Sequence, residues 1–314
     1  MKHDSNRFGI FLALLSAVCY AVNAPFSKIL LAYIPSTLMA GFLYIGAGMA
    51  MVGVKVFQDK ALKRNTEKRL SKAELPYVIA MVALDIAAPI FLMFGLRTTN
   101  AANASLLTNF ETVATAMIAL FFFRETISTR LWTGITFFTF SSILLSVEDL
   151  SALRFSIGSL FIILAYSLWG IENNCTRKLS SKNPCQIVLI KGFCSGVGSL
   201  AIGLALGERL SAVWPIVATL LLGSVAFGMS SYLYVYAQRF LGASRTSAYY
   251  SAAPFIGSVL SFVVFREMPG LQYLIAFAMM IFGAILSSSD RNFFMSKKKD
   301  MMHNPKHDEQ GHQQ

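Results

Sequence analysis

The chain has 314 residues, of which 55% are hydrophobic and only 14% are charged, and its mean hydropathy is +0.57. Soluble domains carry about 25% charged residues, so this composition excludes an ordinary soluble domain. The formal net charge of +11 would indicate a nucleic-acid partner in a soluble protein, but membrane topology explains it if the basic residues collect in the loops of one side.

Ten stretches of the chain are long and apolar enough to cross a membrane. A spanning helix needs about 20 apolar residues, and short polar connectors separate most of the stretches. We expect helices over residues 9–31, 36–57, 75–96, 99–122, 129–147, 156–177, 186–206, 212–235, 243–264 and 270–288. The first stretch is too long for a signal peptide and is expected to stay in the protein. The sequence therefore predicts an all-α membrane protein with a disordered tail over 291–314.

Lysine and arginine residues collect in alternate connectors. If the N-terminus lies in the cytoplasm, 22 of the 27 basic residues fall on the cytoplasmic side, and Lys191 is counted among them. The five on the other side are Lys28, Arg97, Arg154, Arg209 and Arg266. Cytoplasmic loops carry an excess of basic residues, so we expect a multi-pass protein of the cytoplasmic membrane with both termini inside.

The residue types that usually hold metals are poorly placed for that role. All four histidines lie in the polar tails, and the four cysteines show no Cys-x-x-Cys spacing. Thiols in apolar spans usually serve as small packing residues. We therefore expect no metal, no cofactor and no disulfide. An intramembrane enzyme would need a nucleophile with a base or a metal set, so we expect no enzyme.

Two alignments without gaps indicate an internal duplication. At an offset of 149, Asn23 falls on Glu172 and Ser27 falls on Thr176. At an offset of 142, the phrase Phe123-Arg-Glu125 falls on Phe265-Arg-Glu267. Each half holds five helices, an odd number, so the second half enters the membrane from the opposite side. We expect two inverted repeats, over 1–150 and 151–290, with a binding site near the midplane between them.

The two aligned stretches also carry a resemblance. The stretch from Gly95-Leu-Arg-Thr-Thr-Asn-Ala-Ala to Phe123-Arg-Glu125 resembles the fourth-helix signature of the EamA family in the drug/metabolite transporter superfamily. The stretch from Ala237 through Pro254 to Phe265-Arg-Glu267 is similar to that family's ninth-helix signature. The resemblance implies a ten-helix inverted-repeat fold, a cavity lined mainly by helices 1, 3, 4, 6, 8 and 9, and export of small metabolites such as amino acids. The chain departs from the family at Phe110-Glu111-Thr112, where the family usually has a proline.

Aromatic and polar side chains share one face of the first and sixth spans. Tyr20 and Asn23 in the first span are repeated as Trp169 and Glu172 in the sixth, at helical spacing. An aromatic ring one turn from an amide or a carboxylate suits a ligand with an apolar body and a polar head. We expect these four residues to bind substrate, and hydrogen bonding between helices is the alternative.

Two acidic residues lie inside predicted spans. Asp85 is near the middle of span 75–96, and Glu111 lies in span 99–122 one turn from Thr108. A charge at this depth is costly unless it is paired, protonated or exposed to a water-filled cavity, so it indicates a functional site. We expect all three residues to bind substrate and the two carboxyl groups to couple transport to protons. The alternative is that Glu111 stays ionised and pairs with the solute or with Lys28.

Other tyrosines and charged residues in or beside the spans have binding or structural interpretations. Tyr236 and Tyr250 are candidates for substrate binding, and core packing is the alternative. Lys28 and Arg177 lie near span ends, where long basic side chains reach the interface, so we expect anchors. Glu125 and Glu267 follow helix ends and are expected to have structural roles.

These observations predict a secondary transporter that exports a small amphiphilic metabolite such as an amino acid, with proton coupling as a further expectation. Its partners would be a small-molecule solute and the lipid bilayer, and no nucleic acid. Uptake, a carrier of nucleotide sugars, and a receptor or scaffold without transport stay open. Phosphate-rich substrates would favour cationic side chains deep in the cavity, and the sequence indicates an acidic, amidic and aromatic interior. The solute, its direction, the coupling ion and the oligomeric state are not fixed.

Reporter fusions test the expected topology. Because the basic residues favour the side that holds the N-terminus, fusions at Asn65 and Gln314 are expected to report the cytoplasm. A periplasmic or extracellular signal from either fusion contradicts the assignment.

Overall fold

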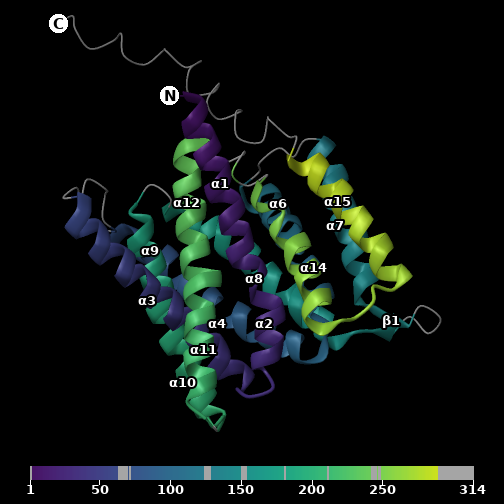
Figure 1. Ribbon diagram of the computed structural model, residues 1–314, viewed down its shortest axis with the longest axis horizontal. Helices are drawn as coiled ribbons and strands as arrows, with labels where there is room; N and C mark the ends of the chain where they lie inside the picture. The colour runs from purple at the N-terminus through teal and green to yellow at the C-terminus, as the bar shows by residue number, and fades with distance from the viewer. Residues whose placement is uncertain are drawn as a thin grey trace, which may run out of the picture.

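A computed structural model describes residues 2–62, 70, 72–123, 129–149, 154–179, 182–210, 212–241, 246 and 249–288. Three features expected from the sequence lie wholly or largely outside these residues: the tail over 291–314, Arg124 with Glu125, and the basic part of the 58–74 loop. The described chain is a bundle of helices that run between two ends of the molecule (Figure 1).

The first half of the chain forms five spanning segments, two of which are broken helices. They are α1 (Lys2–Ala21) with α2 (Asn23–Leu30), α3 (Ser36–Leu62), α4 (Leu75–Thr98), α5 (Ala101–Leu107) with α6 (Phe110–Phe123), and α7 (Thr129–Ser146). The 3-10 turn η1 (Lys72–Glu74) leads into α4.

A short antiparallel hairpin, β1 (Val147–Asp149) and β2 (Arg154–Phe155), leads into the second half. The five segments that follow are α8 (Ile157–Leu179), α9 (Pro184–Ile190) with η2 (Lys191–Ser195) and α10 (Gly196–Ala205), α11 (Trp214–Gly223) with η3 (Ser224–Met229) and α12 (Ser230–Leu241), α14 (Ala253–Phe265), and α15 (Leu271–Ser288). Both η2 and η3 are π-helical. The predicted ten-helix membrane fold is confirmed, and the hairpin is an addition that the sequence did not predict.

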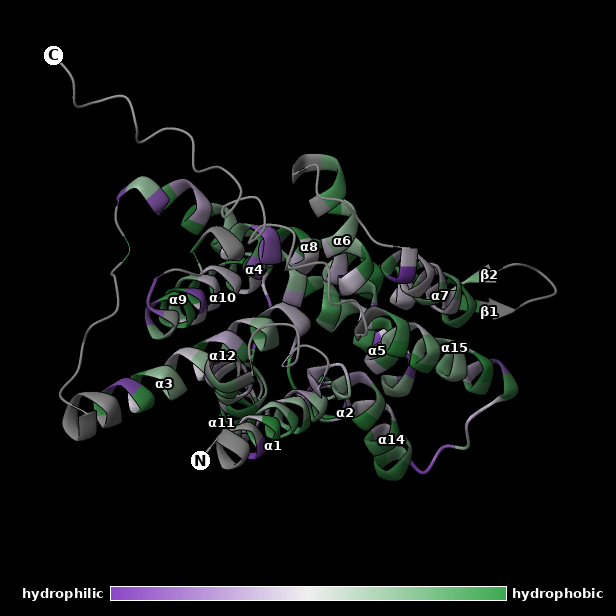
Figure 2. Ribbon diagram, turned by 90° about the horizontal axis from the view of Figure 1, so that it is seen from above, coloured by the Kyte–Doolittle hydropathy of each residue, from purple (hydrophilic) through white to green (hydrophobic). Residues whose placement is uncertain are grey.

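The outer surface of the bundle is apolar. Phe121, Ile157 and Val263 are each more than two-thirds exposed. Seen from above, hydrophobic residues run along most helices (Figure 2). Within the described residues, five helical segments are long and apolar enough to cross a membrane by themselves. Lipid is therefore the solvent that this surface fits.

The helices are arranged around a central pair. At the centre α4 packs against α8, which also contacts α6. At one side α7 packs against α15, and on the other α3 contacts α10 and α11 (Figures 1 and 2). The N-terminus and the final turn of α15 lie at the same end of the bundle, here named the N-terminal end (Figure 1). The side of the membrane that this end faces stays a prediction.

The fourth segment breaks at Thr108 and Asn109 although it lacks the proline expected for the family. At the turn, backbone hydrogen bonds join residues three apart in the chain in place of the four of an α-helix. They run from Asn109 N to Leu106 O (3.1 Å) and from Glu111 N to Thr108 O (3.1 Å). The Asn109 side-chain amide also donates to Leu106 O (3.2 Å), so this carbonyl oxygen accepts two hydrogen bonds at the break. The segment before α14 breaks at Ser251, the residue that the offset of 142 pairs with Asn109.

The duplication is also visible in side-chain hydrogen bonds. The Ser27 hydroxyl donates to the Asn23 amide oxygen (3.1 Å), and the Thr176 hydroxyl donates to Glu172. These pairs are equivalent at the offset of 149. The two halves thus keep the same local geometry, but the acceptor is neutral in the first half and acidic in the second.

Glycines let α3 approach the eighth segment at backbone distance. A Cβ atom at Gly223 would lie 2.0 Å from the Leu43 carbonyl oxygen, and one at Gly46 would lie 2.1 Å from the Leu220 carbonyl oxygen. Real Cβ atoms cannot come this close to backbone, so no side chain fits at either position.

Substitution at this contact tests the packing. Gly223→Val is expected to lower the melting temperature of the purified protein, because overpacking of this kind costs about 1–3 kcal/mol or more. Gly53→Val is the control, since a Cβ at Gly53 meets nothing within 4 Å. Equal melting temperatures for the two variants would show that α3 is free to move away.

Candidate functional site

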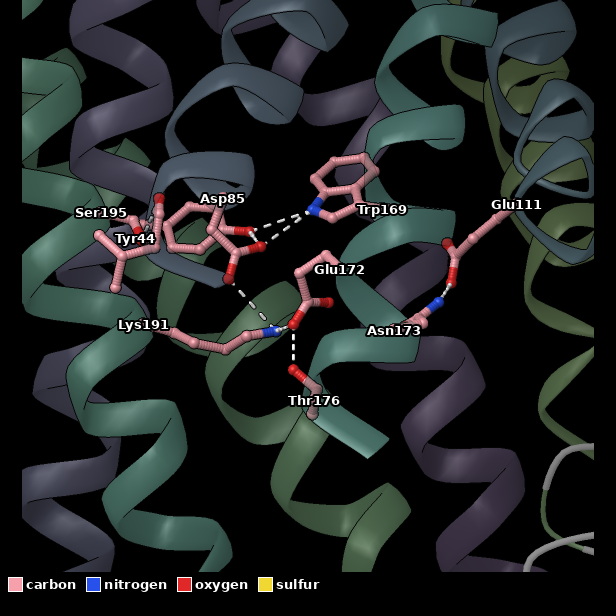
Figure 3. Close-up of polar contacts among 10 residues, drawn as sticks. Tyr44, Asp85, Glu111, Trp169, Glu172, Asn173, Thr176, Lys191 and Ser195 are labelled. Carbon is pink, nitrogen blue, oxygen red and sulfur yellow. Dashed lines mark hydrogen bonds and ion pairs between the residues drawn. The ribbon is translucent and has the colours of Figure 1, made fainter. Parts of the chain in front are cut away.

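An ion cluster joins three helical segments inside the bundle. The Lys191 ammonium nitrogen lies 2.9 Å from Glu172 Oε1 and 3.3 Å from Asp85 Oδ2. Lys191 begins η2, Asp85 lies on α4 and Glu172 lies on α8. Figure 3 shows the three side chains pointing toward one another. They tie the third, sixth and seventh segments together, so the cluster spans the two halves.

The position of Lys191 corrects the sequence analysis. Lys191 was counted with the cytoplasmic basic residues, but it lies within the spanning segment Cys185–Ala205. The interior therefore contains a cation as well as the acidic, amidic and aromatic groups that the sequence indicated. Two carboxylates surround this single cation, so the cluster carries a net charge of −1 when all three groups are ionised.

Both carboxylate oxygens of Asp85 have partners, since Lys191 pairs with Oδ2 and two neutral groups donate to Oδ1. The Tyr44 hydroxyl donates to Asp85 Oδ1 (2.9 Å), and the Trp169 indole N–H donates to the same oxygen (3.2 Å). Asp85 is 0% exposed and Glu172 is 2% exposed, so solvent reaches neither carboxylate to any useful extent. Buried charges need such partners because the membrane interior offers no water to solvate them.

The local structure explains how Lys191 reaches the cluster. The Asn183 side chain caps α9 by accepting from Cys185 N (2.9 Å) and Gln186 N (3.2 Å). The helix then changes to the π form at Lys191, a local distortion that often occurs at functional sites. The Ser195 hydroxyl donates to Val82 O (3.3 Å), which fastens η2 to α4.

Aromatic rings adjoin the ion cluster at Asp85, where Tyr44 and Trp169 contact it. The Trp169 ring lies 5.2 Å from that of Tyr166 and 6.4 Å from that of Phe227. Phe227 in turn lies 5.4 Å from Tyr44 and 6.1 Å from Tyr20. We name these five rings, together with Tyr250, the aromatic group.

Several residues singled out from the sequence meet in this region. Asp85, Trp169 and Glu172 belong to the ion cluster or contact it directly. Tyr20 joins the aromatic group, and Tyr250 packs against it at 6.0 Å. The Thr108 hydroxyl, at the break of the fourth segment, donates to the Tyr166 hydroxyl (3.0 Å).

Glu111 lies beside the cluster on the first turn of α6. Its carboxylate accepts a hydrogen bond from the Asn173 side-chain amide (2.6 Å), and Asn173 is the neighbour of Glu172 on α8. No described lysine or arginine forms an ion pair with Glu111, so its carboxylate is stabilised by the neutral amide donor and by the partial positive charge at the N-terminus of α6. Glu111 and the ion cluster are thus adjacent but differently compensated.

Two candidates lie apart from the ion cluster. Tyr236 packs against Tyr232 and Phe240, with ring distances of 5.8 and 5.7 Å. Asn23 is buried and bonds to Ser27 within its own helix. Their substrate-binding roles stay predictions.

The sequence did not single out five residues of the site: Tyr44, Tyr166, Asn173, Lys191 and Phe227. Lys191 alone carried a usable signal, since it is a basic residue a few positions inside a predicted span. Tyr44 and Phe227 lie in spans that are apolar on every face, where periodicity does not distinguish the core from the lipid side.

Basic and acidic groups at the other end of the bundle have structural partners. The Lys28 ammonium donates to Leu96 O (2.5 Å) and Arg97 O (2.9 Å), and so caps the end of α4. Glu267 accepts a hydrogen bond from Asn100, the N-cap of α5. The side chain of Arg177 lies outside the described part of the chain.

A cavity of about 360 Å³ lies at the end of the bundle opposite the N-terminal end. Its polar lining includes Asn100, Ser156, Glu267 and Gln272. It is separate from the ion cluster, whose two carboxylates are buried. Across the described ranges, no group of three or more histidine, cysteine, aspartate or glutamate side chains is placed to hold a metal ion.

The sequence matches a known family over almost its full length. The profile of the EamA-like transporter family matches residues 7–147 and again residues 156–289. The chain belongs to the EamA-like transporter family. It is therefore a membrane transporter protein whose apolar helices lie in lipid, as its composition predicted.

Curated relatives agree with this membership. An uncharacterized transporter of Methanothermobacter thermautotrophicus is 24% identical over 295 residues, which cover 89% of this chain and 85% of the relative. The uncharacterized transporter YyaM of Bacillus subtilis is 21% identical over 304 residues, which cover 92% and 95% of the two chains. A solved crystal structure has a TM-score of 0.60 and 16% identity, and covers 91% of this chain and 98% of that one. This likeness shows a shared fold.

Substitutions in the ion cluster and the aromatic group test the site. Trp169→Ala removes a donor to Asp85 and the centre of the aromatic group, and Glu172→Gln removes one charge. Both are expected to reduce solute flux in proteoliposomes at least about tenfold, while membrane insertion stays near normal. Trp132→Ala, at an exposed position on α7, and Glu74→Gln, in a peripheral ion pair, are the controls. Wild-type flux in both site variants would show that the substrate binds elsewhere.

Proposed function

We propose that the protein exports a small amphiphilic metabolite, such as an amino acid or a related amine, by alternating access. The observation that carries the proposal is the ion cluster with the aromatic group beside it. Substrate pockets generally combine apolar walls with a few converging polar groups, and this region has both.

The charges of the region favour a solute with a positive group. Asp85, Glu111 and Glu172 supply three carboxylates, and Lys191 is the only described cation paired with any of them. The four groups together carry a charge of −2 when all are ionised, so a solute ammonium group would balance half of it. Aromatic faces also attract cations and accommodate apolar stems, which fits an amphiphilic amine or amino acid.

The inverted repeat supplies a means of alternating access. Carriers built in this way place the substrate near the midplane and rock one repeat against the other. Contacts between the halves occur at two levels: Asn100, the N-cap of α5, bonds to Glu267 after α14, and Ser16 on α1 exchanges hydrogen bonds with Ser230 on α12 (2.7 and 3.0 Å) near the middle of both segments. A motion of one half against the other would rearrange both contacts.

Glu111 is our first choice for the proton-coupling residue, and Asp85 is the second. A carboxylate without a cationic partner in a closed membrane site is stabilised either by a proton or by a cation of the solute. Asp85 already has Lys191 as its counter-ion, whereas Glu111 has a neutral amide. Release of a proton from Glu111 could thus accompany entry of a cationic solute.

Two other functions remain alternatives. A carrier of nucleotide sugars or other anions gains some support from Lys191, the cation in the interior. However, Lys191 is already paired with two carboxylates, so its charge is not available to an anion. Uptake in place of export uses the same site in the reverse direction. We place the protein in the cytoplasmic membrane with both termini inside, as the distribution of basic residues favours.

Proteoliposomes with an imposed pH gradient test transport and coupling together. If a proton is exchanged, flux of candidate amines and amino acids responds to the gradient, and the lumenal pH changes in proportion to the solute moved. Glu111→Gln is expected to abolish both responses, and Glu74→Gln is the control. Flux that ignores the gradient, with no lumenal pH change, removes the proton and leaves Glu111 as a binding residue. No flux for any cationic or zwitterionic solute contradicts the proposed substrate class and favours a receptor or another cargo.

A further inference from the structure

We propose that Asp85 and Glu172 form a binding site for a primary ammonium group, which the protein's own Lys191 occupies in this conformation and which the solute must take from it. The identity of the displacing group rests on the proposed function. The existence of the ammonium site does not.

The geometry is that of a bound alkylammonium ion. The Lys191 nitrogen lies 2.9 Å from the Glu172 carboxylate and 3.3 Å from the Asp85 carboxylate, and the two carboxylates come from different helices. Tyr44 and Trp169 donate to Asp85 Oδ1, and Thr176 donates to Glu172, so neutral donors fix both carboxylates around the nitrogen. The site would keep its shape if another ammonium replaced that of lysine.

Lysine is held less closely by one carboxylate than by the other. Its nitrogen lies 3.3 Å from Asp85 Oδ2 and 2.9 Å from Glu172 Oε1, so the contact with Asp85 is the longer of the two. The lysine stem reaches the site from η2 and limits where its nitrogen can lie. The ammonium of a free solute is not tied to η2, so it can approach both carboxylates equally.

Lysine can also leave. Its side chain is 21% exposed, whereas the carboxylates are 0% and 2% exposed, so lysine is the one member of the cluster that is not fully enclosed. Its departure would leave two buried carboxylates without a cation, which is strongly unfavourable unless another cation enters. The exchange is therefore one cation for one cation, and neutral or anionic solutes do not drive it.

Displacement would change the contacts between helices as well as the occupancy. Lys191 is the first residue of η2, and its ion pairs attach the seventh segment to α4 and α8. A solute ammonium satisfies the same carboxylates without any link to η2. Binding thus removes the ion pairs that link the seventh segment to the third and sixth and leaves the hydrogen bond from Ser195 to Val82, which connects recognition of the solute to helix movement.

Chemical rescue of Lys191→Ala tests the site without knowledge of the natural solute. The substitution removes three methylene groups and the ammonium, which together correspond to n-propylammonium. In the purified full-length protein, Lys191→Ala is expected to melt below wild type. Added n-propylammonium is expected to raise its melting temperature saturably by about 5 °C.

The controls separate a specific site from general effects. 1-Propanol, which has the same stem and no charge, is expected to have no effect. Lys182→Ala, which breaks the peripheral pair with Glu74 (2.9 Å), is expected to show no rescue. The double variants that add Asp85→Asn or Glu172→Gln are expected to lose it. If Lys191→Ala cannot be purified, Lys191→Ser with ethylammonium, and ethanol as the uncharged control, provides the same comparison.

Two results would overturn the inference: equal responses of Lys191→Ala to propylammonium and propanol, or no response to either. Rescue together with an absence of amine flux in wild-type liposomes would instead contradict the proposed function and leave the ammonium site standing. Amine flux in wild-type liposomes without rescue of Lys191→Ala would contradict the ammonium site and leave the proposed function standing.

Discussion

The structure depends on one electrostatic constraint, that three ionisable groups in a membrane interior must compensate one another. Water cannot solvate Asp85, Glu172 or Lys191 at this depth, and removal of one partner from a buried ion pair costs about 3–5 kcal/mol. The surrounding structure follows from this requirement. Tyr44 and Trp169 orient Asp85, Thr176 orients Glu172, and the π-helical turn of η2 places Lys191 between them.

The repeat explains why such a cluster can be both stable and movable. The two halves share the hydroxyl-to-acceptor pair in their first helices, but only the second half carries a carboxylate there. A symmetric scaffold thus carries an asymmetric charge. Because the third segment contributes Asp85 from the first half, the ion pairs cross the boundary between the repeats. Any motion of one half against the other must therefore rearrange them.

The sequence predicted the scaffold well because lipid imposes simple rules. The lengths of apolar stretches gave the spans, and helical spacing placed Trp169, Glu172 and Thr176 on one face, where the structure has them. Lys191 was misplaced because charge bias between loops says nothing about a lysine whose partners lie on other helices. Asp85 gave a hint, since a buried carboxylate indicates a cation nearby, but the identity of that cation depends on helix packing. The break at Asn109 shows a similar limit: the family's proline is absent, yet the helix still breaks, and the asparagine side chain bonds to the backbone at the break.

The central claim, that the charges of the ion cluster must balance, is tested most directly by comparing removal of one charge with removal of all three. Lys191→Met alone leaves two bare carboxylates, whereas Lys191→Met combined with Asp85→Asn and Glu172→Gln leaves no charge in the cluster. Purified proteins are compared by thermal unfolding and by flux in proteoliposomes. If the cluster is a functional site whose charges must balance, the single variant is destabilised, and the triple variant recovers most of the wild-type stability but transports nothing. A single variant as stable as wild type, or a triple variant that still transports, would contradict the account.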